Sequence, residues 1–153
     1  MISLKLIIGG VIILMIAYLA GLSFLSRQTE LKTEGERHLS PCPDKPNCVF
    51  SRSTEKVHAI QSFSMLENNR SKSWTKLILA IQQGGGEILV NDGQYCHAVF
   101  TSKVFRFKDD LEAELSAAQI DIRSASRAGT SDLGKNRKRV EHIRQRYLES
   151  GTG

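Results

Sequence analysis

The sequence predicts an α+β domain in which two helices cover one face of an antiparallel sheet, preceded by an N-terminal transmembrane helix. Three observations support this fold class. Residues 6–25 form a run without a charged side chain, and apolar residues recur at helical spacing in residues 74–81 and 133–147. Between those two helices, alternating segments are separated by short turns, which is typical of hairpins. The predicted order is strand, helix, four strands, helix, with about five strands in the sheet.

The predicted membrane anchor comprises residues 1–27. Its uncharged run is long enough to cross a bilayer as a helix, which takes about 20 residues. A cleaved signal peptide is the alternative, but its apolar core is normally shorter and ends at a small-x-small site. Ala20 is preceded two positions earlier by Tyr18, which does not fit such a site. We therefore expect an uncleaved single-pass anchor, a polar tether over residues 28–38 and one folded domain over residues 39–148.

Cys42 and Cys48 lie in the proline-rich segment S-P-C-P-D-K-P-N-C. Three states are open to them: a disulfide bond, a metal pair with His38 or His58, or two free thiols. A structural zinc site needs four ligands at recognisable spacing, which disfavours the metal. Positive charges beside the anchor slightly favour a cytoplasmic domain. A disulfide persists in oxidising compartments, so the cysteine pair instead predicts a periplasmic domain on an inner-membrane anchor.

The first half of the domain predicts a strand and a helix. Residues 57–65 alternate loosely and predict the first strand. Apolar residues at Trp74 and at the i+3, i+4 and i+7 positions after it predict an amphipathic helix. Ser71 or Ser73 is the expected N-cap, and the three glycines at residues 84–86 are the expected end.

A hairpin and a third strand follow. Residues 87–91 and 95–107 predict the two arms of the hairpin, joined by an Asp-Gly turn at residues 92–93. The two aspartates at residues 109–110 are interpreted as a further turn. Residues 111–115 alternate apolar with acidic side chains, as in a strand with one solvent-exposed face.

The chain then predicts a strand, a turn and a basic helix. The strand over residues 120–127 places side chains alternately on two faces: Ile120, Ile122, Ser124 and Ser126 on one, and Asp121, Arg123, Ala125 and Arg127 on the other. The apolar stripe of the helix comprises Leu133, Val140, Ile143 and Tyr147. Asn136 falls within that stripe and needs polar partners, because a buried unpaired amide costs roughly 1–3 kcal/mol.

Eight residues at this strand–helix junction form the candidate site: Arg123, Ser124, Ser126, Arg127, Ser131, Asp132, Asn136 and Arg137. One interpretation is a polar cluster that locks the helix to the sheet. The other is a ligand-binding site, in which free N–H groups at the start of the helix, Ser hydroxyls and Arg side chains hold an anion.

The charge distribution favours an anionic partner. Net charge is +5, and residues 123–146 hold eight Lys or Arg against two acids, whereas residues 28–122 hold eleven against thirteen. This asymmetry predicts an anionic lipid or small anionic ligand, an acidic patch on the same domain, or a membrane surface as the partner. Nucleic acid is disfavoured, since no aromatic residue interleaves with these charges before Tyr147.

Three motifs occur in order along the domain: L-S-P-C-P-D-K-P-N-C-V, H-A-V-F-T-S-K-V-F-R-F-K-D-D-L-E and R-S-A-S-R-x-G-x-S-D-x-G-x-N-R-x-R-V-E. With them, residues 39–146 resemble the family called "domain of unknown function 1499", found in exported or membrane-attached bacterial proteins and in some plastid proteins. The resemblance implies an aliphatic residue where Cys96 stands, which favours a plain packing role for this thiol. It implies no established activity.

Residue types suited to catalysis are present without a recognisable catalytic frame. His97, Asp109, Asp110, Ser124 and Ser126 can serve acid–base or nucleophilic chemistry, but none lies in a frame such as G-x-S-x-G. The sequence therefore leans away from an enzyme and predicts no cofactor and no metal site.

The expected function is a non-catalytic, membrane-anchored module of the cell envelope that binds an anionic ligand or lipid. The alternatives are a protein-interaction module of an envelope complex and a hydrolase-like enzyme. A lipid binder requires an apolar pocket beside Arg123, Arg127 and Asn136. An interaction module requires a flat exposed patch, and an enzyme requires His97 and an acid together in a cleft.

Overall fold

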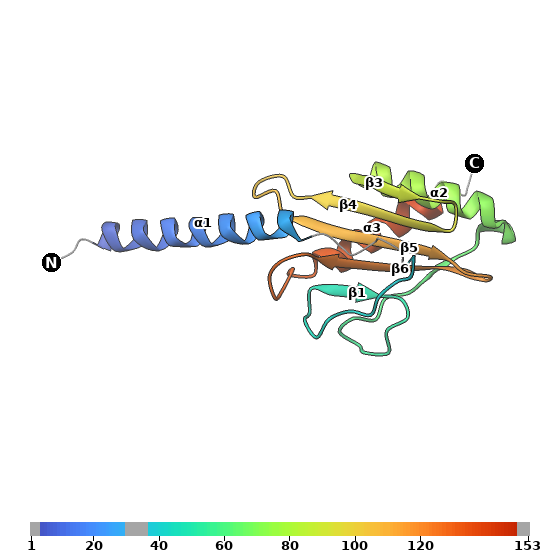
Figure 1. Cartoon of the computed structure of the whole chain (residues 1–153), viewed down its shortest axis with the longest axis horizontal. Coiled ribbons are helices and arrows are strands. Elements are labelled where there is room, and N and C mark those ends of the chain that lie inside the picture. The colour runs from blue at the N-terminus through green and yellow to red at the C-terminus, as the bar shows by residue number, and fades with distance from the viewer. Residues whose placement is uncertain (1–3, 30–36, 150–153) are drawn as a thin grey trace.

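The computed structural model describes residues 4–29 and 37–149, so most of the predicted tether lies outside the described residues. The N-terminal helix α1 (Leu4–Gln28) extends away from one end of the sheet (Figure 1). It has a mean hydropathy of 2.5 over its most apolar stretch and is 6% buried there, so it is long and apolar enough to span a membrane.

The rest of the described chain forms a six-stranded antiparallel sheet with two long helices. The strands are β1 (Cys48–Phe50), β2 (Phe63–Ser64), β3 (Gly86–Asn91), β4 (Tyr95–Thr101), β5 (Lys108–Leu115) and β6 (Gln119–Ser126). Their spatial order is β1-β6-β5-β4-β3, and β2 also pairs with β6. The helices are α2 (Arg70–Gln83) and α3 (Lys135–Glu149), with a short 3-10 turn, η1 (Leu66–Asn68), before α2. The predicted α+β class is confirmed.

Local chemistry defines the ends of α2. Its N-cap is Asn69, whose side chain accepts the Lys72 N–H at 2.9 Å. The predicted cap Ser73 instead donates its hydroxyl to the Asn69 carbonyl, one turn back. After the helix, Gly86 begins β3 under the ring of Phe100, where an added Cβ would approach ring carbon within 2.8 Å. Glycine is therefore required at this crossing.

One face of the sheet carries the main core. α2 and α3 pack against each other and against this face, and α3 runs behind the strands in Figure 1. Fully buried members of this core include Leu77, Ile81, Cys96, Ala98, Leu111, Ala113, Ile120, Ile122 and Val140. Cys96 is fully buried in this core, in agreement with its predicted packing role, and burial raises the pKa of its thiol to about 12.

The predicted strand over residues 57–65 is wrong over most of its length. Only β2 forms a ladder there, because arginine side chains of α3 donate hydrogen bonds to the backbone carbonyls of the residues that precede β2. Arg137 donates to the Val57 and Ala59 carbonyls at 3.1 and 2.7 Å, and Arg144 donates to the Ser62 carbonyl at 2.9 Å. The second edge strand, β1, was not predicted.

Asp109 and Asp110 lie within β5 rather than in a turn, which corrects the sequence interpretation. They pair across the ladder with Ser126 and Ala125. Two acids are compatible with a central strand here because each carboxylate meets an arginine: Arg139 for Asp109 and Arg127 for Asp110. The preceding strand, β4, accordingly ends at Thr101 and not at residue 107.

The second face of the sheet is buried too, so the prediction of a solvent-exposed acidic face on residues 111–115 is wrong. Glu112 is 4% exposed, and it lies beside a smaller apolar cluster formed by Leu39, Phe50 and Tyr95. The segment before β1 supplies part of this cover. A disulfide bond between Cys42 and Cys48 closes that segment, as predicted.

Candidate functional site

Asn136 lies at the centre of a buried hydrogen-bond cluster between α3 and the sheet. Its Oδ1 accepts the Ser124 hydroxyl at 2.7 Å. Its Nδ2 donates to the Asn47 carbonyl at 2.8 Å and to the Ser126 hydroxyl oxygen at 3.1 Å. Both amide hydrogens are therefore used inside the domain, and the cluster locks the start of α3 onto β6.

The loop before α3 uses its own polar groups to cap the helix. The Asp132 carboxylate accepts the Gly134 N–H at 3.0 Å and the Asn136 N–H at 2.6 Å, and the Ser131 hydroxyl oxygen accepts the Leu133 N–H at 3.3 Å. Asp132 is thus the residue that satisfies a free N–H group at the start of the helix. An acid already occupies the place where the sequence interpretation put an external anion.

Arg123 and Arg127 project from the opposite face of β6, because successive side chains alternate along a strand. Arg127 donates from Nε and Nη2 to both oxygens of Asp110, each at 2.7 Å, and His97 Nε2 lies 2.8 Å from the same carboxylate. Arg123 Nη1 donates to Glu112 at 2.9 Å. The eight predicted residues therefore divide over two faces, with Arg137 engaged separately on residues 57–59.

The Asp110 cluster is a buried charge network. Burial alone raises the pKa of Asp110, but hydrogen bonds from His97 and Arg127 outweigh burial and hold that pKa below its ordinary value. Arg127 also donates from Nη1 to the Thr29 carbonyl at 2.8 Å, which connects the network to the chain just after α1. His97 is 3% exposed, so the His–acid pair is present without access from solvent.

A pocket of about 320 Å³, hereafter the α1 pocket, lies where α1 meets the ends of β4, β5 and β6. Leu19 and Leu22 of α1 contribute one apolar wall. The β4–β5 and β6–α3 connections contribute the others, including three predicted site residues: Ser126, Ser131 and Asp132.

Two of the cations that line the α1 pocket form no ion pair within the described residues, whereas its two acids, Asp109 and Asp132, are engaged by Arg139 and by backbone N–H groups. Arg139 lines it but is committed, since it donates to the Asp109 carboxylate and lies 4.7 Å from the centroid of the Phe100 ring. Lys108 and Lys135 also line it, and neither forms an ion pair with any residue in the described ranges. The pocket thus combines an apolar wall with available ammonium groups.

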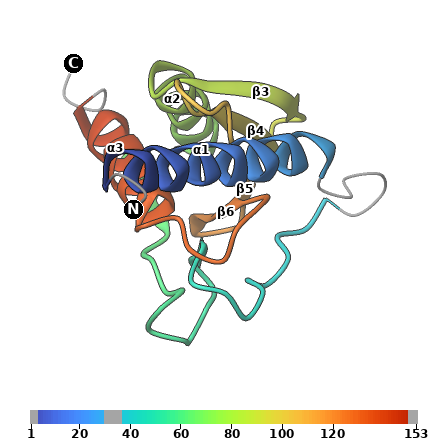
Figure 2. The same cartoon turned by 90° about the vertical axis from the view of Figure 1, so that its left-hand side faces the viewer.

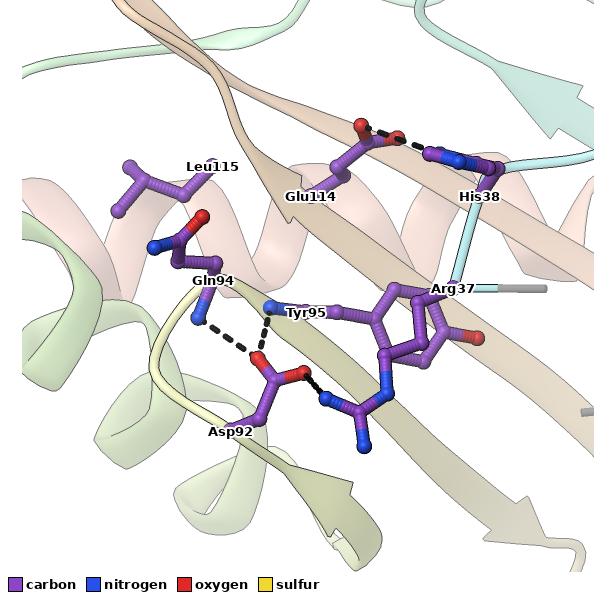
Figure 3. Close-up of a pocket in the computed structure, with 7 residues that line it drawn as sticks. All are labelled: Arg37, His38, Asp92, Gln94, Tyr95, Glu114 and Leu115. Atoms are coloured by element: carbon purple, nitrogen blue, oxygen red, sulfur yellow. Dashed lines mark hydrogen bonds and ion pairs between the residues drawn. The ribbon is translucent and has the colours of Figure 1, made fainter. Parts of the chain in front are cut away.

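A second pocket, of about 400 Å³, lies at the far end of β4 and β5 (Figure 3). Its charged groups largely neutralise each other. Arg37 pairs with Asp92, whose carboxylate also accepts the N–H groups of Gln94 and Tyr95, as Figure 3 shows. Because its charges are internally paired, this pocket is less suited to an anion than the α1 pocket.

Comparison with known families assigns the chain. The sequence model of a family described as "Protein of unknown function (DUF1499)" matches residues 38–147, well over half of the chain. The chain belongs to the DUF1499 family. This confirms the resemblance inferred from the three motifs. No curated protein and no solved structure matches the chain.

The DUF1499 match begins after α1, so the α1 pocket is a composite site. The DUF1499 domain contributes Lys108, Lys135 and the two connections, whereas Leu19 and Leu22 come from the N-terminal helix. Among residues 4–29 and 37–149, no three His, Cys, Asp or Glu side chains gather as a metal site.

Sequence reasoning missed the part of this DUF1499 protein that α1 contributes. The partly or fully buried residues of the last three turns of α1 are Leu19, Leu22, Ser23 and Ser26. Their spacing of i, i+3, i+4 and i+7 places them on one helix face. Two serines on one stripe of an otherwise apolar helix were the available indication that this face contacts protein.

Proposed function

We propose that this chain is a membrane-anchored envelope protein whose DUF1499 domain binds the anionic head group of a lipid, or a related anionic ligand, in the α1 pocket. The single observation that carries the proposal is the composition of that pocket. It sets unpaired Lys108 and Lys135 against an apolar wall from the one candidate membrane-spanning helix that the described residues contain. An amphiphile with an anionic head matches both halves.

Membrane attachment by α1 is supported by its dimensions. Its 25 residues span about 37 Å at 1.5 Å per residue, which exceeds the hydrocarbon thickness of roughly 30 Å. Nearly all of its large apolar side chains are exposed, including Val11 and Leu14 at 60% and 71%. A helix so apolar and so little covered by its own domain fits lipid as its surroundings.

A periplasmic position of the domain on an inner-membrane anchor is supported by the bond between Cys42 and Cys48. Disulfides persist in oxidising compartments and are rare where thiols are kept reduced. The thiols are joined to each other, which leaves neither available for the metal pair that the sequence allowed.

The experiment is native mass spectrometry of the full chain, purified from its own membranes in mild detergent. We expect a defined bound mass in the range of an anionic lipid or metabolite. The double variant Lys108→Ala, Lys135→Ala removes two charge-assisted contacts and should reduce bound occupancy at least about tenfold.

The matched control is Lys45→Ala, Lys56→Ala. These two lysines are exposed and lie outside the α1 pocket, so the control removes the same charge and should retain the ligand. Equal loss in both double variants would refute the pocket as the site. A bare protein throughout would instead favour the alternative of a protein-interaction module.

A further inference from the structure

Two loops beside the end of α1 each expose an aliphatic side chain almost completely. Val104, in the β4–β5 connection, is 80% exposed, and Leu133, in the β6–α3 connection, is 84% exposed. The next most exposed large apolar residue of the described domain is Leu148, at 54%. Both loops lie at the end of the sheet that Figure 2 views, with α1 in front of the ends of β5 and β6. We call Val104 and Leu133 the apolar tip.

Contacts with α1 define the position of the apolar tip along the axis of that helix. The Ser23 hydroxyl donates to the Phe105 carbonyl, and the Lys108 N–H donates to the Ser26 hydroxyl oxygen at 3.2 Å. The uncharged run of α1 continues to Ser26, one residue before Arg27. Ser23 lies three residues inside that end, or about 4.5 Å along the helix. The neighbour of Val104 is therefore level with the last turn of the apolar run.

The backbone at and beside the tip includes two non-glycine residues in a left-handed conformation. Leu133 has φ 55° and Arg106 has φ 58°, in the left-handed region that favours glycine. A bulky residue is unfavourable there, because its Cβ approaches the neighbouring carbonyl oxygen too closely. Burial of Leu133 within the domain cannot offset that cost, because its side chain is mostly exposed. Contact with an apolar surface outside the domain can stabilise this exposed side chain.

The charges around the tip are mostly positive, and the acid beside Leu133, Asp132, is engaged by the Gly134 and Asn136 N–H groups. Residues 102–107 contain Lys103 and Arg106 and no acid, and both cations are exposed. Lys135, also exposed, follows the second loop. Aliphatic side chains at the apolar boundary with cations beside them are the arrangement by which protein surfaces enter an anionic membrane interface.

We propose that the apolar tip inserts into the bilayer that α1 spans, so that Val104 and Leu133 enter the boundary between head groups and acyl chains. This inference rests on the membrane anchoring in the proposed function but not on the pocket ligand. Insertion fixes the domain against the membrane and turns the α1 pocket toward the lipid head groups. Each aliphatic side chain that moves out of water favours the inserted position, because burial of apolar surface is favourable.

The test places an environment-sensitive fluorophore on single cysteines in the full chain. Val104→Cys and Leu133→Cys report on the tip, Leu89→Cys on an aliphatic residue of β3 that is 52% exposed, and Phe24→Cys on α1. The native cysteines do not interfere, since Cys96 is buried and the other two are bonded. The proteins are reconstituted in vesicles of phosphatidylethanolamine and phosphatidylglycerol with or without a quencher on the acyl chains.

We expect fluorophores at residues 24, 104 and 133 to show blue-shifted emission that the acyl-chain quencher reduces. The fluorophore at residue 89 should show water-like emission without quenching. Quenching at residue 24 but water-like emission at both tip positions would overturn the insertion while leaving the anchor intact. Water-like emission at residue 24 as well would overturn the anchor itself. A tip that is shielded in native membranes but not in pure lipid vesicles would overturn lipid insertion in favour of a protein partner.

Discussion

Asp110 is a fully buried carboxylate that Arg127 and His97 hold in its charged form. Its pKa in the folded chain lies below the ordinary value of 3.8. Ionised Asp110 therefore contributes stability above the unfolded pKa, and this contribution is lost as pH falls through the folded pKa. Urea unfolding of the wild type and Asp110→Asn from pH 7 to pH 2 measures it. The difference in free energy of unfolding should be constant near neutrality and shrink in acid. A difference independent of pH would contradict this account.

Asn136 is the polar residue on which the packing of α3 depends. Asn136→Ala leaves the Asn47 carbonyl without its Asn136 donor and Ser124 without its acceptor, both in buried surroundings. We expect a loss of about 1–3 kcal/mol in the free energy of unfolding, measured with denaturant. Lys138→Ala, on the exposed side of α3, should change it by less than about 0.5 kcal/mol. Equal effects of the two changes would show that the cluster does not lock the helix.

At the scale of elements, the last turn of α1 is held by two serines. Ser23→Ala combined with Ser26→Ala removes the acceptor for the Lys108 N–H and the donor for the Phe105 carbonyl. Hydrogen exchange of residues 102–108 in detergent should accelerate. Leu14→Ala, on a residue 71% exposed in α1, should leave that exchange unchanged. Unchanged exchange in the serine variant would mean that α1 does not dock on the β4–β5 connection.

The proline-rich segment before β1 is held closed by its disulfide, which spans a separation of six residues. Cys42→Ser combined with Cys48→Ser should lower the free energy of unfolding by about 2 kcal/mol, as loop-closure entropy predicts for so short a loop. Mass spectrometry without reductant should find one thiol, Cys96, reacting only after unfolding. Two additional reactive thiols in protein from native membranes would remove the main support for a periplasmic domain.

The elements that sequence alone predicts are those whose pattern is local. The helix at Trp74, the strand at Ile120 and the face shared by Ser124 and Ser126 all follow from spacing, and the structure contains each of them. The cover of the second sheet face does not follow from spacing. Glu112 alternates as a solvent-exposed residue does, and its burial depends on Arg123 and on a segment distant in the chain.

The candidate site is predictable in part for the same reason. The sequence identified Asn136 as a residue needing partners and placed Ser126 on its face of the sheet. It also grouped Arg127 with them, although alternation alone places that side chain on the opposite face of the same strand. The α1 pocket depends on where a separate helix docks, and no local pattern in residues 108–139 specifies that contact.

For the whole molecule, the proposed binding site is composite, because α1 completes a pocket that the DUF1499 domain provides only in part. Leu19 belongs to the anchor, whereas Lys108 and Lys135 belong to the domain. An anionic amphiphile bound there contacts both. The position of the bound amphiphile, between α1 and the DUF1499 domain, distinguishes this proposal from binding elsewhere on a basic protein.

The most direct test is photo-crosslinking with a phosphatidylglycerol analogue that carries a diazirine near its head group. The full chain is reconstituted in vesicles containing the analogue, irradiated, digested and mapped by mass spectrometry. We expect crosslinks in residues 19–22, 101–108 and 128–139 together, and their loss in the Lys108→Ala, Lys135→Ala variant. Crosslinks confined to the exposed faces of α1, or located around Arg37 and Asp92 at the far pocket, would contradict it.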